Sequence, residues 1–146
     1  MDFTLHPQLV DDTYTLGDFP LSVLLLSRDA NYPWFILVPK RAEISEVFQL
    51  SQSDQNQLQQ ESIALSQALY GAFSADKLNV AALGNVVPQL HVHHIIRYTT
   101  DIAWPSPVWG FTQANAYSDE HLKECKSTAI DALAKSDFIP LIDTQK

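Results

Sequence analysis

The segment that most restricts the fold of this chain is residues 84–98, which reads GNVVPQLHVHHIIRY. Its many β-branched and apolar residues predict a strand over about 90–98. Because side chains on a strand point alternately to opposite faces, this segment has two different faces. The polar face carries Gln89, His91, His93, Ile95 and Arg97. The apolar face, which predicts contact with a core, carries Leu90, Val92, His94, Ile96 and Tyr98. An amide, two imidazoles and a guanidinium in one row can bind and attack a phosphate.

Composition and charge narrow the range of functions. The chain has 146 residues, of which 46% are hydrophobic and 18% are charged, as is typical of a soluble globular protein. We expect one domain over residues 1–146, with its core at about 21–110. The formal net charge of -8 provides no broad positive surface for a nucleic acid. The apolar runs are too short for a membrane span, and residues 1–7 do not resemble a secretory signal. We therefore expect a cytoplasmic protein that binds neither nucleic acids nor membranes.

Hydrophobic periodicity predicts the elements around the histidine segment. Apolar runs predict strands at 21–27, 34–38, 77–83 and 90–98, and residues 1–20 are expected to form a loose arm with a short strand near 13–16. A helical repeat predicts a long helix from an N-cap at Ser53 to about residue 73, with Glu61 on its solvent face. Ser118 is expected to cap a last helix over about 118–134. This order predicts an α+β fold, in which an antiparallel sheet of about five strands packs one face against a long central helix and a C-terminal helix.

The residues around the histidines resemble the signature of the histidine triad (HIT) family, which is His-x-His-x-His followed by apolar residues and often an arginine. Gly84–Val87 resembles the family's Gly-Gln-x-Val lead-in, and Arg97 resembles the trailing arginine. This register makes Gln89, His91 and His93 the three triad positions. A register that starts the triad at His91 would lose both flanking matches, so we reject it.

The resemblance extends over about residues 21–97 and implies a HIT-like fold. The segment WFILVPKR at 34–41 resembles the family's second strand, with Trp34 where a histidine is common. After the triad, AWPSPVWG at 103–110 resembles a bacterial branch of the family. The resemblance also implies a homodimer, a small nucleotide as substrate, and neither a cofactor nor a metal.

Covalent nucleotidyl transfer is the mechanism that the resemblance implies. His91 would attack the α-phosphate of a nucleoside phosphoramidate or a dinucleoside polyphosphate, and water would release a nucleoside monophosphate from the nucleotidyl-histidine. His93 would bind the phosphate oxygens and could protonate the leaving group. Gln89 would replace the first histidine with an amide, which can donate a hydrogen bond but has no ionisable proton.

Further contacts to the nucleotide are also implied by the resemblance. The candidates are Asn85 and Asn79 for the phosphates, Ser27 and Asp29 for the ribose hydroxyls, and Trp34 for the nucleoside. Trp104 and Trp109 could line the leaving-group side. Arg97 is interpreted as a structural residue paired to a carboxylate, and His94 as a core or interface histidine.

Two alternatives stay open at the level of sequence. A His-x-His pair on one strand face can bind a divalent metal, but such a site needs a third ligand. No Glu follows the pair at short spacing, and Gln89 is a poor ligand. The second alternative is a nucleotide-binding protein with weak or lost catalysis, because the first triad position is Gln89.

Overall fold

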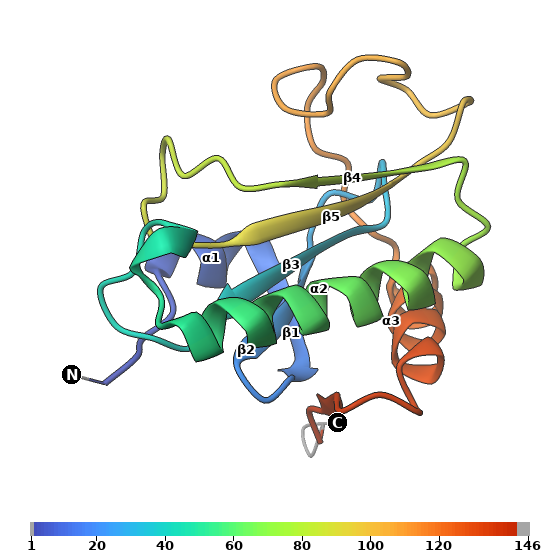
Figure 1. The fold of residues 1–146 in the computed structure, drawn as a ribbon. Coiled ribbons are helices and arrows are strands. Elements are labelled where there is room, and N and C mark those ends of the chain that lie inside the picture. Colours follow the sequence, from blue (N-terminus) through green and yellow to red (C-terminus); the bar gives the residue numbers. More distant parts are fainter. Residues whose placement is uncertain (1, 143–146) are drawn as a thin grey trace.

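Six antiparallel strands form the sheet that organises the molecule. The computed structural model describes residues 2–142, so residues 1 and 143–146 of the expected domain lie outside the described residues. The strands are β1 (Thr13–Asp18), β2 (Ser22–Ser27), β3 (Trp34–Pro39), β4 (Lys77–Ala81), β5 (Val92–Arg97) and β6 (Ile139–Pro140). Their order is β4-β5-β3-β2-β1-β6, and each neighbouring pair is antiparallel (Figure 1). The predicted α+β class is confirmed, with six strands where about five were expected.

The helices of the described chain are α1 (Pro7–Asp12), α2 (Gln52–Ala72) and α3 (Asp119–Ala132), together with the short 3-10 helix η1 (Val47–Gln49). The predicted long helix and C-terminal helix are both confirmed. The expectation of a loose arm over residues 1–20 was wrong for Pro7–Asp12, which form α1, whereas the short strand expected near 13–16 is present as β1. Pro7 occupies the first turn of α1, where its missing N–H costs nothing, and the His6 side chain accepts a hydrogen bond from the Gln8 amide. A helix of 6 residues has too short an apolar repeat to be predicted from sequence.

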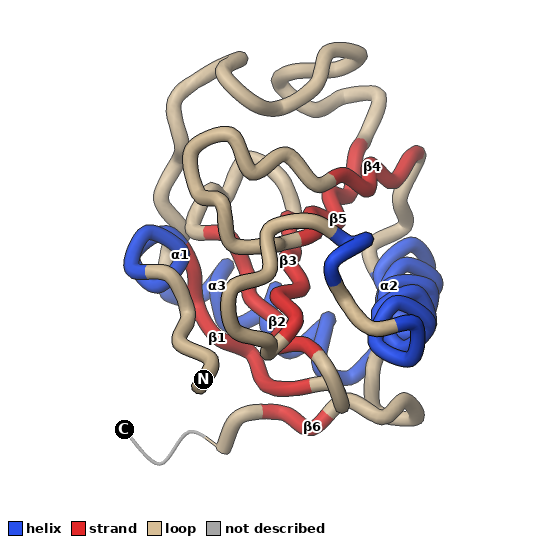
Figure 2. The backbone as a smooth tube through the Cα atoms, turned by 60° about the vertical axis from the view of Figure 1, so that its left-hand side comes forward, coloured by secondary structure: helices blue, strands red, loops and turns tan. Residues whose placement is uncertain are grey.

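The two faces of the sheet are covered differently. Figure 2 shows α1 and α2 on opposite sides of the strands. Helices α2 and α3 cover one face and enclose the main core, which includes Leu24, Leu26, Phe35, Leu37, Leu65, Leu69, Ile96 and Ala129. On the other face, Leu9 of α1 packs with Val23, Leu25, Ile36 and Val38. Both faces of β2 and β5 are therefore buried, which explains the continuous apolar run of β2.

Helix α2 differs from its prediction at two positions. Its N-cap is Ser51 rather than Ser53, and the Ser51 hydroxyl accepts a hydrogen bond from the Asp54 amide at 3.1 Å. Glu61 is buried and does not face water. Its two carboxylate oxygens accept the backbone N–H groups of Leu21 and Ser22 at 2.7 and 3.1 Å. A long helical repeat alone could not reveal this contact, because the partners lie at the start of β2, distant in the chain.

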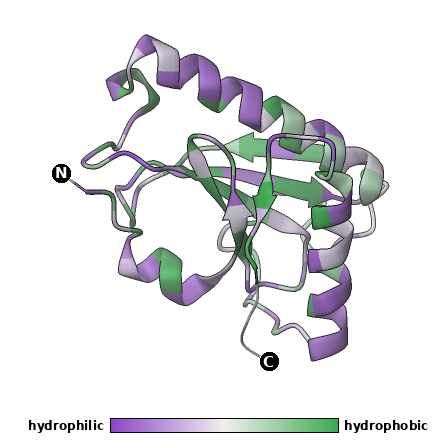
Figure 3. Ribbon diagram, turned by 90° about the horizontal axis from the view of Figure 1, so that it is seen from below, coloured by the Kyte–Doolittle hydropathy of each residue, from purple (hydrophilic) through white to green (hydrophobic). Residues whose placement is uncertain are grey.

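Hydropathy follows this layered arrangement. Hydrophobic residues gather on the strands, and the outer faces of the helices are largely hydrophilic (Figure 3). None of the helices in residues 2–142 combines the length and the apolar character required to cross a bilayer.

Candidate active site

Strand β5 lies between β3 and β4 and presents the histidines to both faces of the sheet. His93 pairs with Ile36 of β3, and His94 pairs with Phe35. His93 and His94 lie on opposite faces of β5, so the predicted alternation of side chains between faces is confirmed within the strand. His93 lines a cavity on the face that α1 covers, whereas His94 hydrogen-bonds to α2.

The histidine pocket is this cavity, lined by His91, His93, Asn85, Trp34, Trp109 and Leu9 among other residues. Its volume is about 680 Å³, which lies within the usual range for small-molecule sites. Residues from α1, the β2–β3 connection, the segment before β5 and the loop after β5 all contribute to its walls. Of the predicted site residues, the structure brings His91, His93, Asn85, Ser27, Asp29 and Trp34 together here.

A backbone carbonyl fixes the tautomer of His91. The Nδ1 atom of His91 lies 2.7 Å from the carbonyl oxygen of Gln89. Because a carbonyl oxygen only accepts, the proton must be on Nδ1, and Nε2 keeps its lone pair. The bond to the carbonyl therefore orients the His91 ring with Nε2 as the atom available for nucleophilic attack.

An indole fixes the opposite tautomer on His93. The Nε1–H of Trp34 donates to His93 Nδ1 at 2.9 Å, and an indole nitrogen can only donate. Nδ1 of His93 must then be the acceptor, so its single proton lies on Nε2. Burial, together with the charges of His91 and His94, lowers the pKa of His93 to about 3. His93 is thus a neutral hydrogen-bond donor whose ring lies 4.9 Å from the His91 ring and 5.1 Å from the Trp109 ring.

His94 belongs to the core face, as predicted. The ring is fully buried, with Nε2 lying 2.7 Å from the Ser62 hydroxyl of α2 and Nδ1 lying 3.1 Å from the Val92 carbonyl. Burial lowers the pKa of His94 to about 4, against the opposing effect of the hydrogen bond to Val92. His94 therefore stays neutral and ties β5 to α2.

Comparison with known proteins decides the family. The HIT domain model matches residues 8–100 of the sequence, which include the histidine segment. The chain belongs to the HIT domain family.

Solved structures of histidine triad proteins agree with this assignment. A histidine triad protein from Bradyrhizobium japonicum is 45% identical with a TM-score of 0.89, and the match covers 90% of this chain and 98% of that one. One from Marinobacter aquaeolei VT8 is 44% identical with a TM-score of 0.89, covering 92% and 98%. One from Sinorhizobium meliloti 1021 is 41% identical with a TM-score of 0.87, covering 90% and 97%. No curated protein matches the sequence significantly.

Gln89, predicted from the sequence to be the first triad position, does not line the histidine pocket. Its side-chain oxygen accepts the His6 amide at 2.9 Å, and its side-chain nitrogen donates to the Thr4 carbonyl at 2.9 Å. The strand begins only at Val92, so the alternation expected from residue 89 onward does not extend to Gln89. The side chain of Gln89 thus holds the N-terminal segment, and its backbone carbonyl orients His91.

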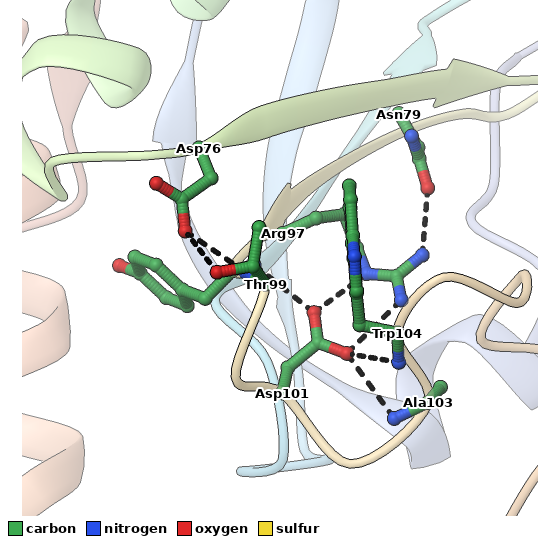
Figure 4. Close-up of polar contacts among 8 residues, drawn as sticks. Asp76, Asn79, Arg97, Thr99, Asp101, Ala103 and Trp104 are labelled. Carbon is green, nitrogen blue, oxygen red and sulfur yellow. Dashed lines mark hydrogen bonds and ion pairs between the residues drawn. The ribbon is translucent and has the colours of Figure 1, made fainter.

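Asn79 is the other predicted site residue that the structure keeps out of the histidine pocket. It lies on β4, where its Oδ1 accepts from Nη1 of Arg97 at 2.9 Å (Figure 4). Arg97 also makes a bidentate pair with Asp101, with distances of 2.8 and 3.0 Å, as expected for a structural arginine. Burial would raise the pKa of Asp101, but hydrogen bonds from Arg97, Tyr98 and Trp104 hold it below its usual value.

The side chains of Ser27 and Asp29 accept hydrogen bonds from backbone N–H groups of nearby loops. The Ser27 hydroxyl accepts the Asp29 amide at 3.2 Å. One carboxylate oxygen of Asp29 accepts the backbone N–H groups of Asn31 and Asn115 at 3.0 and 3.1 Å. These bonds fasten the loop after β5 to the end of β2 and close one side of the histidine pocket.

Sequence reasoning missed the contribution of α1 to the histidine pocket. Gln8, Leu9 and Asp12 line it, and no residue pattern in the N-terminal segment indicated this role. Trp109 lines it as expected, whereas Trp104 packs over the Arg97 guanidinium at 5.5 Å from its ring centroid. The two tryptophans look alike in sequence, and only the path of the loop separates them.

Proposed function

We propose that this HIT domain hydrolyses or transfers the nucleotidyl group of small nucleotide conjugates through a covalent intermediate on His91. HIT domain proteins are generally nucleotide-binding hydrolases and transferases. The observation that carries the proposal is the bond from His91 Nδ1 to the Gln89 carbonyl, because it leaves Nε2 as a nucleophile beside a donor histidine. The substrates are nucleoside phosphoramidates or dinucleoside polyphosphates.

The chemistry has two steps. Nε2 of His91 attacks the α-phosphorus, and the bond to the leaving group breaks with its electron pair. The phosphorylated ring carries a positive charge, which the Nδ1–H bond to the Gln89 carbonyl stabilises. Water then attacks phosphorus, the P–N bond breaks with its electron pair on Nε2, and one proton of the water passes to solvent as the nucleoside monophosphate forms.

The remaining residues of the histidine pocket bind the nucleotide in this proposal. The Nε2–H of His93 donates to a phosphoryl oxygen, and the Asn85 amide supplies a second donor. Ser27 and Asp29 bind the ribose hydroxyls, with Trp34 beside the nucleoside. Asn79 is not part of this set, because its side chain is bonded to Arg97.

Trapping the intermediate tests the proposal. We expect brief incubation with labelled adenosine phosphoramidate or diadenosine triphosphate to place the label on His91, as mapped by mass spectrometry at high pH. His91→Ala should lower turnover by at least about a thousandfold, because a missing nucleophile removes the covalent route. His121→Ala on the exposed face of α3 is the control. Turnover by His91→Ala at the wild-type rate would refute the proposal.

A second candidate is nucleotide binding with little catalysis. It is favoured by the use of the Gln89 amide to hold residues 4 and 6 rather than a substrate. Nucleotide binding in calorimetry, without label on His91 from either substrate, would establish this function instead.

The metal alternative has less support. Among residues 2–142, no group of three or more His, Cys, Asp or Glu side chains is placed to hold a metal ion. His91 and His93 have no third ligand of these types beside them in the described chain. Metal analysis of the purified protein decides this point.

We further propose that the protein is a cytoplasmic homodimer, as the family resemblance implies. Strand β4 is at one edge of the sheet, and Val80, Leu83 and Val86 on or after it are exposed. A second copy that covers this edge would satisfy the open strand. Analytical ultracentrifugation, with Val80→Lys as the disrupting variant, tests the assembly.

A further inference from the structure

The supply of a proton to the leaving group distinguishes this site from a triad of three histidines. The candidates to give that proton are the two predicted triad positions on either side of His91, namely Gln89 and His93. At the first position, Gln89 has no ionisable proton, and both ends of its amide are bonded to the N-terminal segment.

At the third position, His93 is fixed as a hydrogen-bond donor and cannot act as a general acid. Because the Trp34 indole donates to His93 Nδ1, a second proton on this ring would place two N–H groups against each other. His93 therefore holds one proton, on Nε2. Releasing that proton would leave an imidazolate anion in a buried site, which is prohibitively unfavourable. His93 can bind a phosphoryl oxygen, but it cannot transfer a proton.

The charged groups around the histidine pocket are not placed to donate a proton to the leaving group either. Asp29 accepts two backbone N–H groups through one oxygen, and Asp12 accepts the Gln8 side-chain amide at 2.9 Å. Arg28 lies with its guanidinium carbon 3.9 Å from the Tyr14 ring centroid and does not release its proton. His91 has its proton on Nδ1, which is directed to the Gln89 carbonyl.

We infer that this site acts on nucleotides whose leaving group departs as a weakly basic anion without receiving a proton. Phosphates of nucleotide anhydrides and carboxylates of acyl nucleotides have this property, whereas amines, alcohols and ordinary phenols do not. This inference rests on the proposed function and selects the anhydrides over the phosphoramidates.

The bond changes balance for an anhydride. The lone pair of His91 Nε2 forms the P–N bond, and the P–O bond breaks with its electron pair on the leaving phosphate. This phosphate is stable as an anion near pH 7 and needs no acid. Cleavage of a phosphoramidate P–N bond would instead release an amide anion unless the nitrogen were first protonated.

A series of aryl esters of adenosine 5′-monophosphate tests the inference with the nucleotide kept constant. We expect kcat/KM to fall about a hundredfold from the acidic 4-nitrophenyl ester to the phenyl ester, since general acids typically contribute about 10²–10⁴-fold. A fall of more than about tenfold supports the inference. A smaller fall would show that the enzyme supplies a proton, and the inference would be wrong.

The tautomer of His93 gives a test that does not depend on activity. Nitrogen-15 NMR of the wild-type protein should show His93 with a bare Nδ1 and a protonated Nε2 at pH 7, and still neutral at pH 5. Trp34→Phe keeps an aromatic ring but removes the N–H, so the Nδ1 resonance of His93 should shift. Trp109→Phe is the matched control, because its ring is close to His93 without this hydrogen bond, and it should leave the tautomer unchanged. A protonated Nδ1 in the wild type, or no response to Trp34→Phe, would overturn the inference.

Different results would refute the proposed function and the inference about the leaving group. If no substrate or ester places a nucleotide on His91, the proposed function is wrong and the inference falls with it. If a nucleotide reaches His91 but phenyl and 4-nitrophenyl esters react at similar rates, only the inference about the leaving group is wrong.

Discussion

The roles of single residues in this protein are set by hydrogen-bond partners that can only donate or can only accept a proton. The Gln89 carbonyl and the Trp34 indole assign opposite tautomers to His91 and His93, so two identical side chains have different chemistry. The same reasoning applies to Arg97, whose guanidinium is buried between Asp101 and Asn79. Because a buried charge must be paired, this cluster is sensitive to the loss of any partner.

Asp101→Asn should lower the free energy of unfolding by about 3–5 kcal/mol, because it leaves the buried Arg97 charge without a counter-ion. The matched control is Asp54→Asn, which breaks a bidentate pair with the half-exposed Arg41 and should cost less than about 1 kcal/mol. Urea unfolding at pH 7 measures both. Equal effects of the two substitutions would contradict the structural role assigned to Asp101.

The lowered pKa of Asp101 also fixes the sign of its pH dependence. The stability that the pair contributes is present above the unfolded pKa of an aspartate, about 3.9, and is lost as the pH falls through the lower folded value. Asp101→Asn should therefore remove part of the acid sensitivity below about pH 4.

The elements around the histidine pocket are held together by contacts between residues that are distant in sequence. Gln89 holds Thr4 and His6 immediately before α1, and α1 provides one wall of the histidine pocket. On the opposite face, Glu61 of α2 fixes the start of β2. The side chains at these positions therefore determine how short elements pack on the sheet.

Gln89→Ala should release the N-terminal segment and raise KM about tenfold, with a smaller change in kcat, because α1 lines the histidine pocket but carries none of the proposed catalytic side chains. Faster amide hydrogen exchange in residues 4–12 should accompany the change. Gln60→Ala on the exposed side of α2 serves as the control. A large fall in kcat with KM unchanged would mean that the Gln89 amide acts in the transition state.

At the scale of the whole molecule, the buried strand β5 carries two neutral histidines, His93 at the histidine pocket and His94 in the core. Burial lowers the pKa of His93 to about 3 and that of His94 to about 4, whereas an unfolded chain has histidines near 6.5. Between these values the unfolded state binds protons that the folded state does not. Stability should therefore fall as the pH drops from about 6.5 toward 4.

Acidification from pH 7 to pH 5 should cost about 2 kcal/mol of unfolding free energy for each of the two histidines. In His94→Gln this pH-dependent loss should be about 2 kcal/mol smaller, although the variant is less stable at pH 7 through its altered bonds to Ser62 and Val92. Urea unfolding at the two pH values measures the difference, with His121→Gln as the exposed control. An unchanged pH dependence in His94→Gln would contradict the assignment of a neutral, buried His94.

The sequence by itself determined the strands β1 to β5, the long helix and the division of His93 and His94 between faces. These features follow from local periodicity, because backbone geometry converts residue spacing directly into a face. The tertiary structure alone decided that α1 forms a wall of the histidine pocket, that Gln89 and Asn79 bond elsewhere, and that Glu61 is buried. It also decided the sixth strand, because β6 approaches β1 at Gly17, where a Cβ would lie 2.2 Å from the Ile139 carbonyl oxygen. Each of these depends on a partner distant in the chain, and residue spacing carries no information about such a partner.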